Sequence, residues 1–301
     1  MTDSISLSLN AVIVAVTKDR PRILVVESGE GQYGIPSGPL DPVADKTLEL
    51  GLRRWIREQT GLDVGYVEQL YTFGDRGRRR SPDEPRPLAL AYLALIREEQ
   101  PSPGAAWSDW YELFPWEDTR EGRPPALEAL TGRLRTWAEN DEPMSARLQV
   151  TFGIEPTPWD PIRALERYEL LYQADLVAEA FRDRGDTPPI LDSGRELAFD
   201  HRRIAATGLS RLRGKLTYRP LVFELMPETF TLTQLQRTVE ALVGMRMHKQ
   251  NFRRLVERGQ LVEGTGTHSA ATGGRPAELF RFREEVVGER PRPGLGLPRL
   301  R

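Results

Sequence analysis

Residues 36–62 read PSGPLDPVADKTLELGLRRWIREQTGL, which combines a Pro-Ser-Gly turn, an amphipathic segment and a glycine stop. Apolar residues recur there in steps of three and four, which predicts that they share one face of a helix. They are Leu48, Leu52, Trp55, Ile56 and, just past the end, Leu62. Gly61 suits the end of that helix, because glycine readily takes the left-handed conformation that follows many helices. Such a turn and helix form a catalytic unit when carboxylates line the helix's outer face.

The same stretch resembles a Nudix box, whose pattern is G-x5-E-x7-R-E-U-x-E-E-x-G-U with U apolar. Counted back from Gly61-Leu62, three residues match the arginine, the apolar position and the first late glutamate of this pattern. They are Arg54, Ile56 and Glu58. The resemblance implies a Nudix fold for this part of the chain.

The departures from the pattern concern its carboxylates. Lys46, Trp55 and Gln59 stand where the pattern has glutamates, and Gly38 matches its opening glycine only if the loop is two residues longer. Nudix hydrolysis needs several carboxylates to hold Mg²⁺, and Glu58 alone cannot supply them. The resemblance therefore implies a domain kept for binding, with no catalytic and no metal-binding residues. An ordinary amphipathic helix stays open as the alternative for this segment.

Composition places the chain among globular proteins with room for two domains. It has 301 residues, 29% of them charged, and contains no apolar run of membrane-spanning length. The start, MTDSISLSLN, lacks the features of a secretory signal. The absence of cysteine excludes disulfides, thiolate metal sites and cysteine nucleophiles. We expect a cytoplasmic protein with no membrane partner.

Four segments around the Nudix-like helix predict strands. They are residues 8–16, 22–27, 64–73 and 88–96, with a turn over 17–21 between the first two. The run LALAYLALI at 88–96 suits a buried position in a sheet. Two strands, a helix and two more strands predict an α/β domain with a mixed sheet.

Residues 71–78, YTFGDRGR, followed by AYLAL at 91–95, resemble the NrtR group of Nudix-related transcriptional regulators. The resemblance implies a nucleotide site in this domain. Arginines could meet phosphates there, and Tyr71 or Phe73 could stack on a base. The predicted ligand-binding residues are Gly38, Arg54, Glu58, Tyr71, Phe73, Arg76 and Arg78.

Residues 97–190 differ in kind, since they hold five of the six tryptophans and many prolines and charges. Periodicity predicts helices over 125–140 and 159–183. We interpret the region as a helical insertion whose aromatics form a small satellite core, with an effector or dimer surface as the alternative. The motifs WSDWY, PWED and ERYELLY resemble the NadQ branch of these regulators.

Residues 196–216 predict one helix with Asp200 and His201 near its start. In the NrtR family such an LAFDH helix closes the Nudix domain and leads to the DNA-binding part. A general-base role for His201 is less favoured than a packed or solvated histidine, because no nucleophile or metal cluster accompanies it.

The segment after residue 217 predicts a winged helix-turn-helix. Two amphipathic helices are expected over 232–244 and 248–259, and two strands over 261–265 and 277–282 flank a glycine-rich tip. Residues 218–301 hold 14 basic and 9 acidic residues, which favours a polyanionic partner. The motifs FTLTQLQ, NFRR and GRPAELFRF resemble the C-terminal half of NrtR-type regulators.

Polar residues of the second helix are the predicted DNA contacts, because Asn and Gln can read adenine while Arg reads guanine or phosphate. The set comprises Lys249, Gln250, Asn251, Arg253 and Arg254, with Arg275 at the wing. Asn251 and Gln250 are assigned to bases, and the three arginines mainly to the backbone.

These observations predict a sensing domain over 1–216 with an insertion over 97–190, a winged helix domain over 217–287 and a disordered tail over 288–301. The resemblance implies a homodimeric repressor of NAD biosynthesis genes that binds a palindromic operator on double-stranded DNA. No cofactor is required, and the effector is ADP-ribose, NAD or ATP. Two alternatives stay open. One is a Nudix-type nucleotide diphosphate hydrolase, and the other is a nucleotide-binding scaffold with a protein-binding winged helix.

Overall fold

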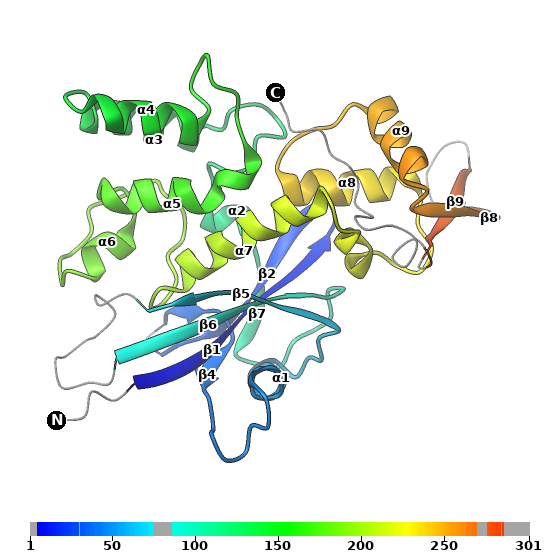
Figure 1. The fold of residues 1–301 in the computed structure, drawn as a ribbon, viewed down its shortest axis with the longest axis horizontal. Coiled ribbons are helices and arrows are strands. Elements are labelled where there is room, and N and C mark those ends of the chain that lie inside the picture. Colours follow the sequence, from blue (N-terminus) through cyan, green and yellow to red (C-terminus); the bar gives the residue numbers. More distant parts are fainter. Residues whose placement is uncertain (1–4, 30, 75–85, 270–275, 284, 286–301) are drawn as a thin grey trace.

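The structure is a computed structural model that describes residues 5–29, 31–74, 86–269, 276–283 and 285 (Figure 1). Its N-terminal elements are β1 (Ile5–Thr17), β2 (Arg20–Glu27), β3 (Tyr33–Gly34), β4 (Ser37–Pro39), α1 (Leu48–Thr60), β5 (Tyr66–Phe73), β6 (Arg86–Leu95) and β7 (Ala105–Asp109). Then follow α2 (Trp110–Leu113), α3 (Pro125–Trp137), α4 (Glu142–Phe152), the 3-10 turn η2 (Pro161–Arg163), α5 (Ala164–Gln173), α6 (Ala178–Arg182) and α7 (His201–Leu216). The chain continues with η3 (Leu221–Leu225), α8 (Leu232–Val243), α9 (Lys249–Gly259), β8 (Val262–Ser269) and β9 (Ala277–Phe282).

A mixed seven-stranded sheet organises the first half of the chain. The strand order is β3-β2-β1-β6-β5, with β4 also paired to β1 and β7 to β2. β1 runs parallel to β6, and the other pairs are antiparallel. The four predicted strands are confirmed, and so is the α/β mixed sheet. The turn between β1 and β2 is shorter than predicted, because Lys18 and Asp19 take left-handed conformations with φ of 51° and 61°.

Alternation along β1 sends side chains to two separate cores. Leu9 and Ile13 face α1, while Val12 and Val14 face the opposite layer of helices. The predicted helix at 48–62 is confirmed as α1, capped by the Thr47 side chain and ended by Gly61 with φ of 70°. Its buried face is narrower than predicted: Leu52, Ile56 and Leu62 are buried, but Leu48 is 37% exposed and Trp55 is half-buried.

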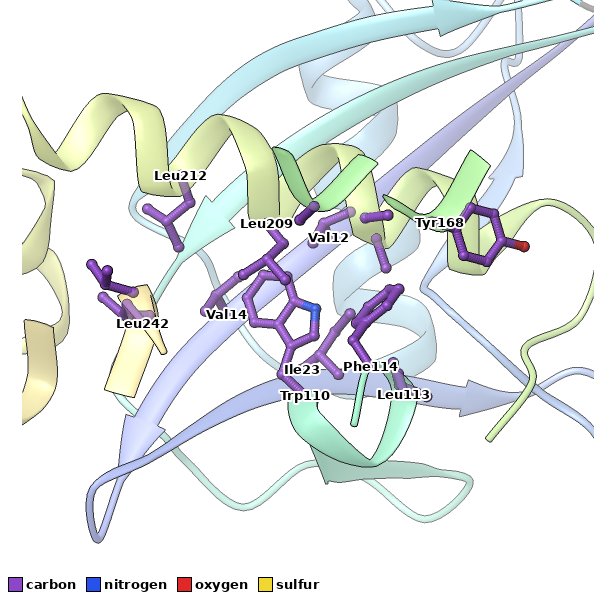
Figure 2. Close-up of a cluster of buried hydrophobic side chains, with 14 of the residues drawn as sticks. Val12, Val14, Ile23, Trp110, Leu113, Phe114, Tyr168, Leu209, Leu212 and Leu242 are labelled. Carbon is purple, nitrogen blue, oxygen red and sulfur yellow. The ribbon is translucent and has the colours of Figure 1, made fainter. Parts of the chain in front are cut away.

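The larger core is continuous from the sheet to the winged helix. It contains Val14 of β1, Trp110 and Trp116 of the insertion, Leu209 of α7 and Leu242 of α8; Figure 2 shows all of these but Trp116. The prediction of a satellite core was wrong for these two tryptophans, because their rings are completely buried in the main core. The sheet domain and the winged helix therefore share buried apolar surface, which holds them together.

Several predicted boundaries in the second half differ from the structure. The predicted insertion at 97–190 contains β7, which belongs to the main sheet. The helix expected over 159–183 is broken into η2, α5 and α6, with Asp175 left-handed at φ of 57° in the break. The helix expected over 196–216 begins only at His201, because Phe199 is left-handed at φ of 52°. α4 and η3 were not predicted.

The C-terminal part is a winged helix-turn-helix, as predicted. α8 begins with a capping box, in which the side chains of Thr231 and Gln234 each accept a backbone N–H of the other residue. α9 follows, and β8 and β9 form the antiparallel wing. Residues 286–301 lie outside the described part, so the predicted tail stays a prediction. No helix in the described ranges combines the length and apolar character that crossing a membrane requires.

Candidate functional site

The Nudix-like loop is held by the side chains that replace its glutamates. Trp55 Nε1 donates to Pro39 O at 2.8 Å, and the Gln59 amide both accepts from Ser37 N and donates to Ser37 O at 2.9 Å. The indole lies against Gly38, where an added Cβ would come within 2.1 Å of a ring atom. Trp55 and Gln59 thus serve as structural clamps where catalytic enzymes would hold a metal.

The predicted arginine and glutamate of the box pair with each other and with the loop. Arg54 Nε and Nη2 contact the two carboxylate oxygens of Asp45 at 3.0 and 2.9 Å, and Arg54 Nη1 lies 3.4 Å from Glu58 Oε2. The Arg54 guanidinium holds the pKa of Asp45 below its ordinary value. In the described ranges no three carboxylates or histidines gather as a metal site. These residues do not fit a catalytic Mg²⁺, which requires a cluster of oxygen ligands.

We expect Gly38→Ala to lower the free energy of unfolding by about 1–3 kcal/mol, because its Cβ would overlap the Trp55 ring. Urea denaturation would measure the change. Gly65→Ala is the matched control, since no heavy atom lies within 4 Å of its added Cβ. Equal midpoints for the two variants would contradict the close packing of Trp55 on the loop.

A cavity of about 1360 Å³ opens between one end of the sheet and the helices of the insertion. The sheet side consists of Ser6, Leu7, Ser8 and Asn10 of β1, Ser28, Gly29 and Gln32 of the β2–β3 turn, Ser37, Gly38 and Pro39 of β4, and Pro87 and Ala89 of β6. The helical side consists of Arg147 of α4, Tyr168, Glu169, Tyr172 and Gln173 of α5, and Arg182 and Asp183 at the end of α6. Phe199, Asp200, His201, Arg203 and Ile204, at and just before the start of α7, complete it. The volume exceeds what most drug-sized ligands need.

The helical side supplies charge and aromatic surface. Arg203 Nη2 lies 2.8 Å from Glu169 Oε1, and Arg182 donates to the backbone oxygens of Leu197 and Phe199. Tyr172 OH donates to a carboxylate oxygen of Asp183 at 3.0 Å. Burial and that carboxylate raise the pKa of Tyr172 to about 12, so the phenol stays a donor at neutral pH. Guanidinium groups and exposed rings beside polar sheet residues suit a ligand with phosphates and an aromatic base.

His201 fixes the start of α7 to the sheet. Its Nδ1 accepts from Ile35 N at 3.1 Å, so this nitrogen is the unprotonated one, and the side chain is buried. Gly34 provides the space, because a Cβ there would lie 2.5 Å from His201 Nδ1. This geometry agrees with the interpretation that His201 is a packed histidine, which the sequence favoured over a general-base role.

The predicted ligand residues that the structure describes are not gathered in one place. Gly38 lines the cavity, but Arg54 and Glu58 are tied to the α1 loop on the other face of the sheet. Phe73 is buried in the larger core, and Tyr71, 59% exposed, contacts its ring edge-on at 5.2 Å. Neither residue is among those that line the cavity, and their assignment to a ligand stays a prediction. Arg76 and Arg78 lie outside the described residues.

The cavity residues on α5 and α7 were not selected from the sequence as ligand residues. Two quoted motifs nevertheless contain them: ERYELLY includes Glu169 and Tyr172, and LAFDH includes Phe199. Their shared feature is an aromatic next to a charge, which also occurs in ordinary helices. The signal was present but did not indicate that the two segments meet.

α9 presents a polar face to solvent. Phe252 and Val256 are buried in the larger core, whereas the predicted DNA contacts on the helix are all exposed. These are Lys249, Gln250, Asn251, Arg253 and Arg254. Arg275 lies outside the described residues, so its place at the wing stays a prediction. The face has the charge and side-chain chemistry that a major groove requires.

Comparisons with known proteins match both halves of this arrangement. Residues 222–282 match the NrtR DNA-binding winged helix domain. A protein described as "ADPR responsive transcriptional repressor NtrR" from Acinetobacter baylyi is 41% identical over 87 residues, which are 29% of this chain and 34% of that protein. The matched stretch thus spans about a third of the relative's length.

Two solved structures share the fold over nearly the whole chain. NrtR from Shewanella oneidensis in complex with a 27mer DNA has a TM-score of 0.56 at 21% identity, covering 94% of this chain and 95% of that one. A MutT/nudix family protein from Enterococcus faecalis has the same TM-score at 16% identity, covering 94% of this chain and 88% of that one. Residues 222–282 therefore form an NrtR-type winged helix domain, and the chain as a whole shares the two-part fold of these solved structures.

Proposed function

We propose that this protein is a DNA-binding transcriptional repressor of NAD biosynthesis genes that senses an adenine-dinucleotide-related metabolite. The observation that carries the proposal is the joining, through one continuous core, of a large polar cavity to an NrtR-type winged helix with an exposed polar α9. We place the functional boundary near residue 217, with sensing before it and DNA binding over 217–287. The motifs WSDWY, PWED and ERYELLY of the insertion resemble the NadQ branch of these regulators, and we predict that the protein belongs to that branch.

We propose ADP-ribose as the first effector to test, with NAD and ATP as the other two. The A. baylyi relative is described as ADPR responsive. In the cavity, Arg203 and Arg147 would meet the phosphates, and Tyr172 would stack on the base. The Nudix-box residues would not take part in catalysis, because Trp55 and Gln59 are committed to the loop.

Tyr172→Leu is expected to weaken ADP-ribose binding by about 1–3 kcal/mol, the usual worth of stacking on a base. Isothermal calorimetry would measure it. Tyr218→Leu is the matched control, because Tyr218 is about as exposed, at 39% against 37%, and does not line the cavity. Equal affinities of the two variants would place the nucleotide elsewhere.

Incubation with ADP-ribose and Mg²⁺ or Mn²⁺ is expected to yield no product above the uncatalysed background, because the described residues offer no cluster of oxygen ligands for a metal. Chromatography of the nucleotide would detect turnover. Hydrolysis that disappears in Glu58→Gln would establish the hydrolase alternative instead.

Measurements of DNA affinity test the proposed role as a repressor. The protein should retain DNA from upstream of NAD biosynthesis genes more tightly than random DNA, and saturating effector should change that affinity by a factor of about 5–150. We propose a homodimer on a palindromic site, whose two α9 helices would lie about 34 Å apart. Absence of binding to either DNA at moderate salt would favour a protein-binding winged helix.

A further inference from the structure

The C-terminal end of α8 is held by the sensing part of the chain. The last carbonyl groups of a helix lack partners within it. Here Tyr111 OH donates to Ala241 O at 2.6 Å, and Arg213 Nε donates to Leu242 O at 3.0 Å. Thr119 donates through both its backbone nitrogen and its hydroxyl to Gly244 O, at 2.7 and 2.8 Å. The start of the connection to α9 is therefore bonded directly to the other domain.

A buried carboxylate organises these donors. Glu117 is fully buried, and its oxygens contact the guanidinium groups of Arg167, at 2.5 Å, and Arg213. Both arginines are also fully buried. Arg167 further donates to the backbone oxygens of Thr151 and Asp160. We call Glu117, Arg167, Arg213, Tyr111 and Thr119 the Glu117 cluster.

The two arginines belong to helices that also line the cavity. Arg167 lies on α5 beside Tyr168 and Glu169, which face the cavity. Arg213 lies on α7, whose first turn carries Arg203. The first residues of α7 line the cavity. In Figure 1 the helix runs from the side of α6 toward α8, and its 16 residues span about 24 Å. A ligand that shifts α5 or α7 would move a guanidinium bonded to Glu117.

We propose that the Glu117 cluster positions the recognition helix α9 relative to the cavity and transmits the state of the cavity to it. The transmission rests on the proposed effector-controlled DNA binding, whereas the positioning does not. The cluster joins the body of the protein to the end of α8 through buried hydrogen bonds. The charge-assisted bonds among them have strict geometry, which limits how far α8 and the following α9 can move. None of its residues lines the cavity or belongs to α9, so they act as positioning residues.

The positioning can be measured as a distance in the full chain. The protein has no cysteine, so Gln100→Cys on the body and Glu257→Cys on α9 provide the two sites for spin labels. Labelled chains diluted with unlabelled ones should give one narrow distance distribution. The Tyr111→Phe/Thr119→Val double variant removes two donors without changing charge, and Glu117→Gln removes the buried charge. Both should broaden the distribution.

The matched control is Tyr92→Phe, which alters a buried tyrosine in the core on the α1 face of the sheet. It should leave the distribution unchanged. An unchanged distribution in the double variant, with its fold verified by circular dichroism, would overturn the proposal even if Glu117→Gln fails to fold.

The transmission is measured as the ratio of DNA affinities without and with saturating ADP-ribose. In the double variant we expect this ratio to fall at least fivefold toward one, while calorimetric ADP-ribose affinity stays within threefold of wild type. A broadened distribution with an unchanged ratio would refute the transmission. If wild type itself shows a ratio of one, the proposed function fails, and the distance measurement alone still decides the positioning.

Discussion

Glu117→Leu is expected to lower the free energy of unfolding by about 3–5 kcal/mol, among the largest effects of any single change in this chain. The substitution leaves Arg167 and Arg213 fully buried without their counter-charge. Removing one partner of a buried ion pair costs this much because the remaining charge keeps its desolvation penalty. A typical domain is stable by about 5–15 kcal/mol, so urea denaturation should show a greatly reduced midpoint.

A control variant separates the effect of losing the ion pairs from the effect of altered packing. Glu117→Leu combined with Arg167→Met and Arg213→Met removes all three charges and keeps apolar volume. This variant should regain much of the lost stability, because buried ion clusters are often no better than apolar replacements. A single Glu117→Leu variant within 1 kcal/mol of wild type would contradict the buried cluster.

The same carboxylate should make the wild type sensitive to acid. Burial alone raises the pKa of Glu117, but the Arg167 and Arg213 guanidinium groups outweigh it and hold the pKa below the ordinary 4.5. A group with a lowered folded-state pKa contributes stability above its unfolded pKa and loses it as pH falls through the folded value. The stability difference between wild type and Glu117→Leu should therefore shrink below about pH 4.5.

Asn251→Ala is expected to weaken operator binding by about 1–3 kcal/mol and to leave binding to random DNA nearly unchanged. Asn251 is exposed on α9, and its amide can pair with the donor and acceptor edge of adenine. Loss of such a base contact removes discrimination only at the specific site. Fluorescence anisotropy with operator and random duplexes would measure both affinities.

Arg254→Ala should behave differently, because we assign Arg254 to the phosphate backbone. Both DNAs should lose affinity alike, and the salt dependence should flatten by about one unit of slope. Leu255→Met is a control on the same helix, since Leu255 lies half-buried and keeps its volume in this exchange. Wild-type affinity of Asn251→Ala for both DNAs would show that another face or another partner is used.

The sequence by itself determined the elements whose information is local. Three- and four-residue apolar steps specify α1, α8 and α9, and Gly61 and the Thr231–Gln234 capping box mark helix ends within a few residues. The motif resemblances, read in order, were sufficient for the two-part fold. The departures at Trp55 and Gln59 were also visible, although the loop clamps they form were not.

Tertiary structure alone decided what lies together across long separations. Glu117 is 50 positions from Arg167 and 96 from Arg213, and each resembles a solvated surface charge in the sequence. The cavity is likewise built from β1, the insertion and the start of α7, while Phe73, predicted to bind a ligand, packs in the core. The physical reason is that burial and charge pairing depend on which surfaces meet, whereas periodicity reports only which residues share a face.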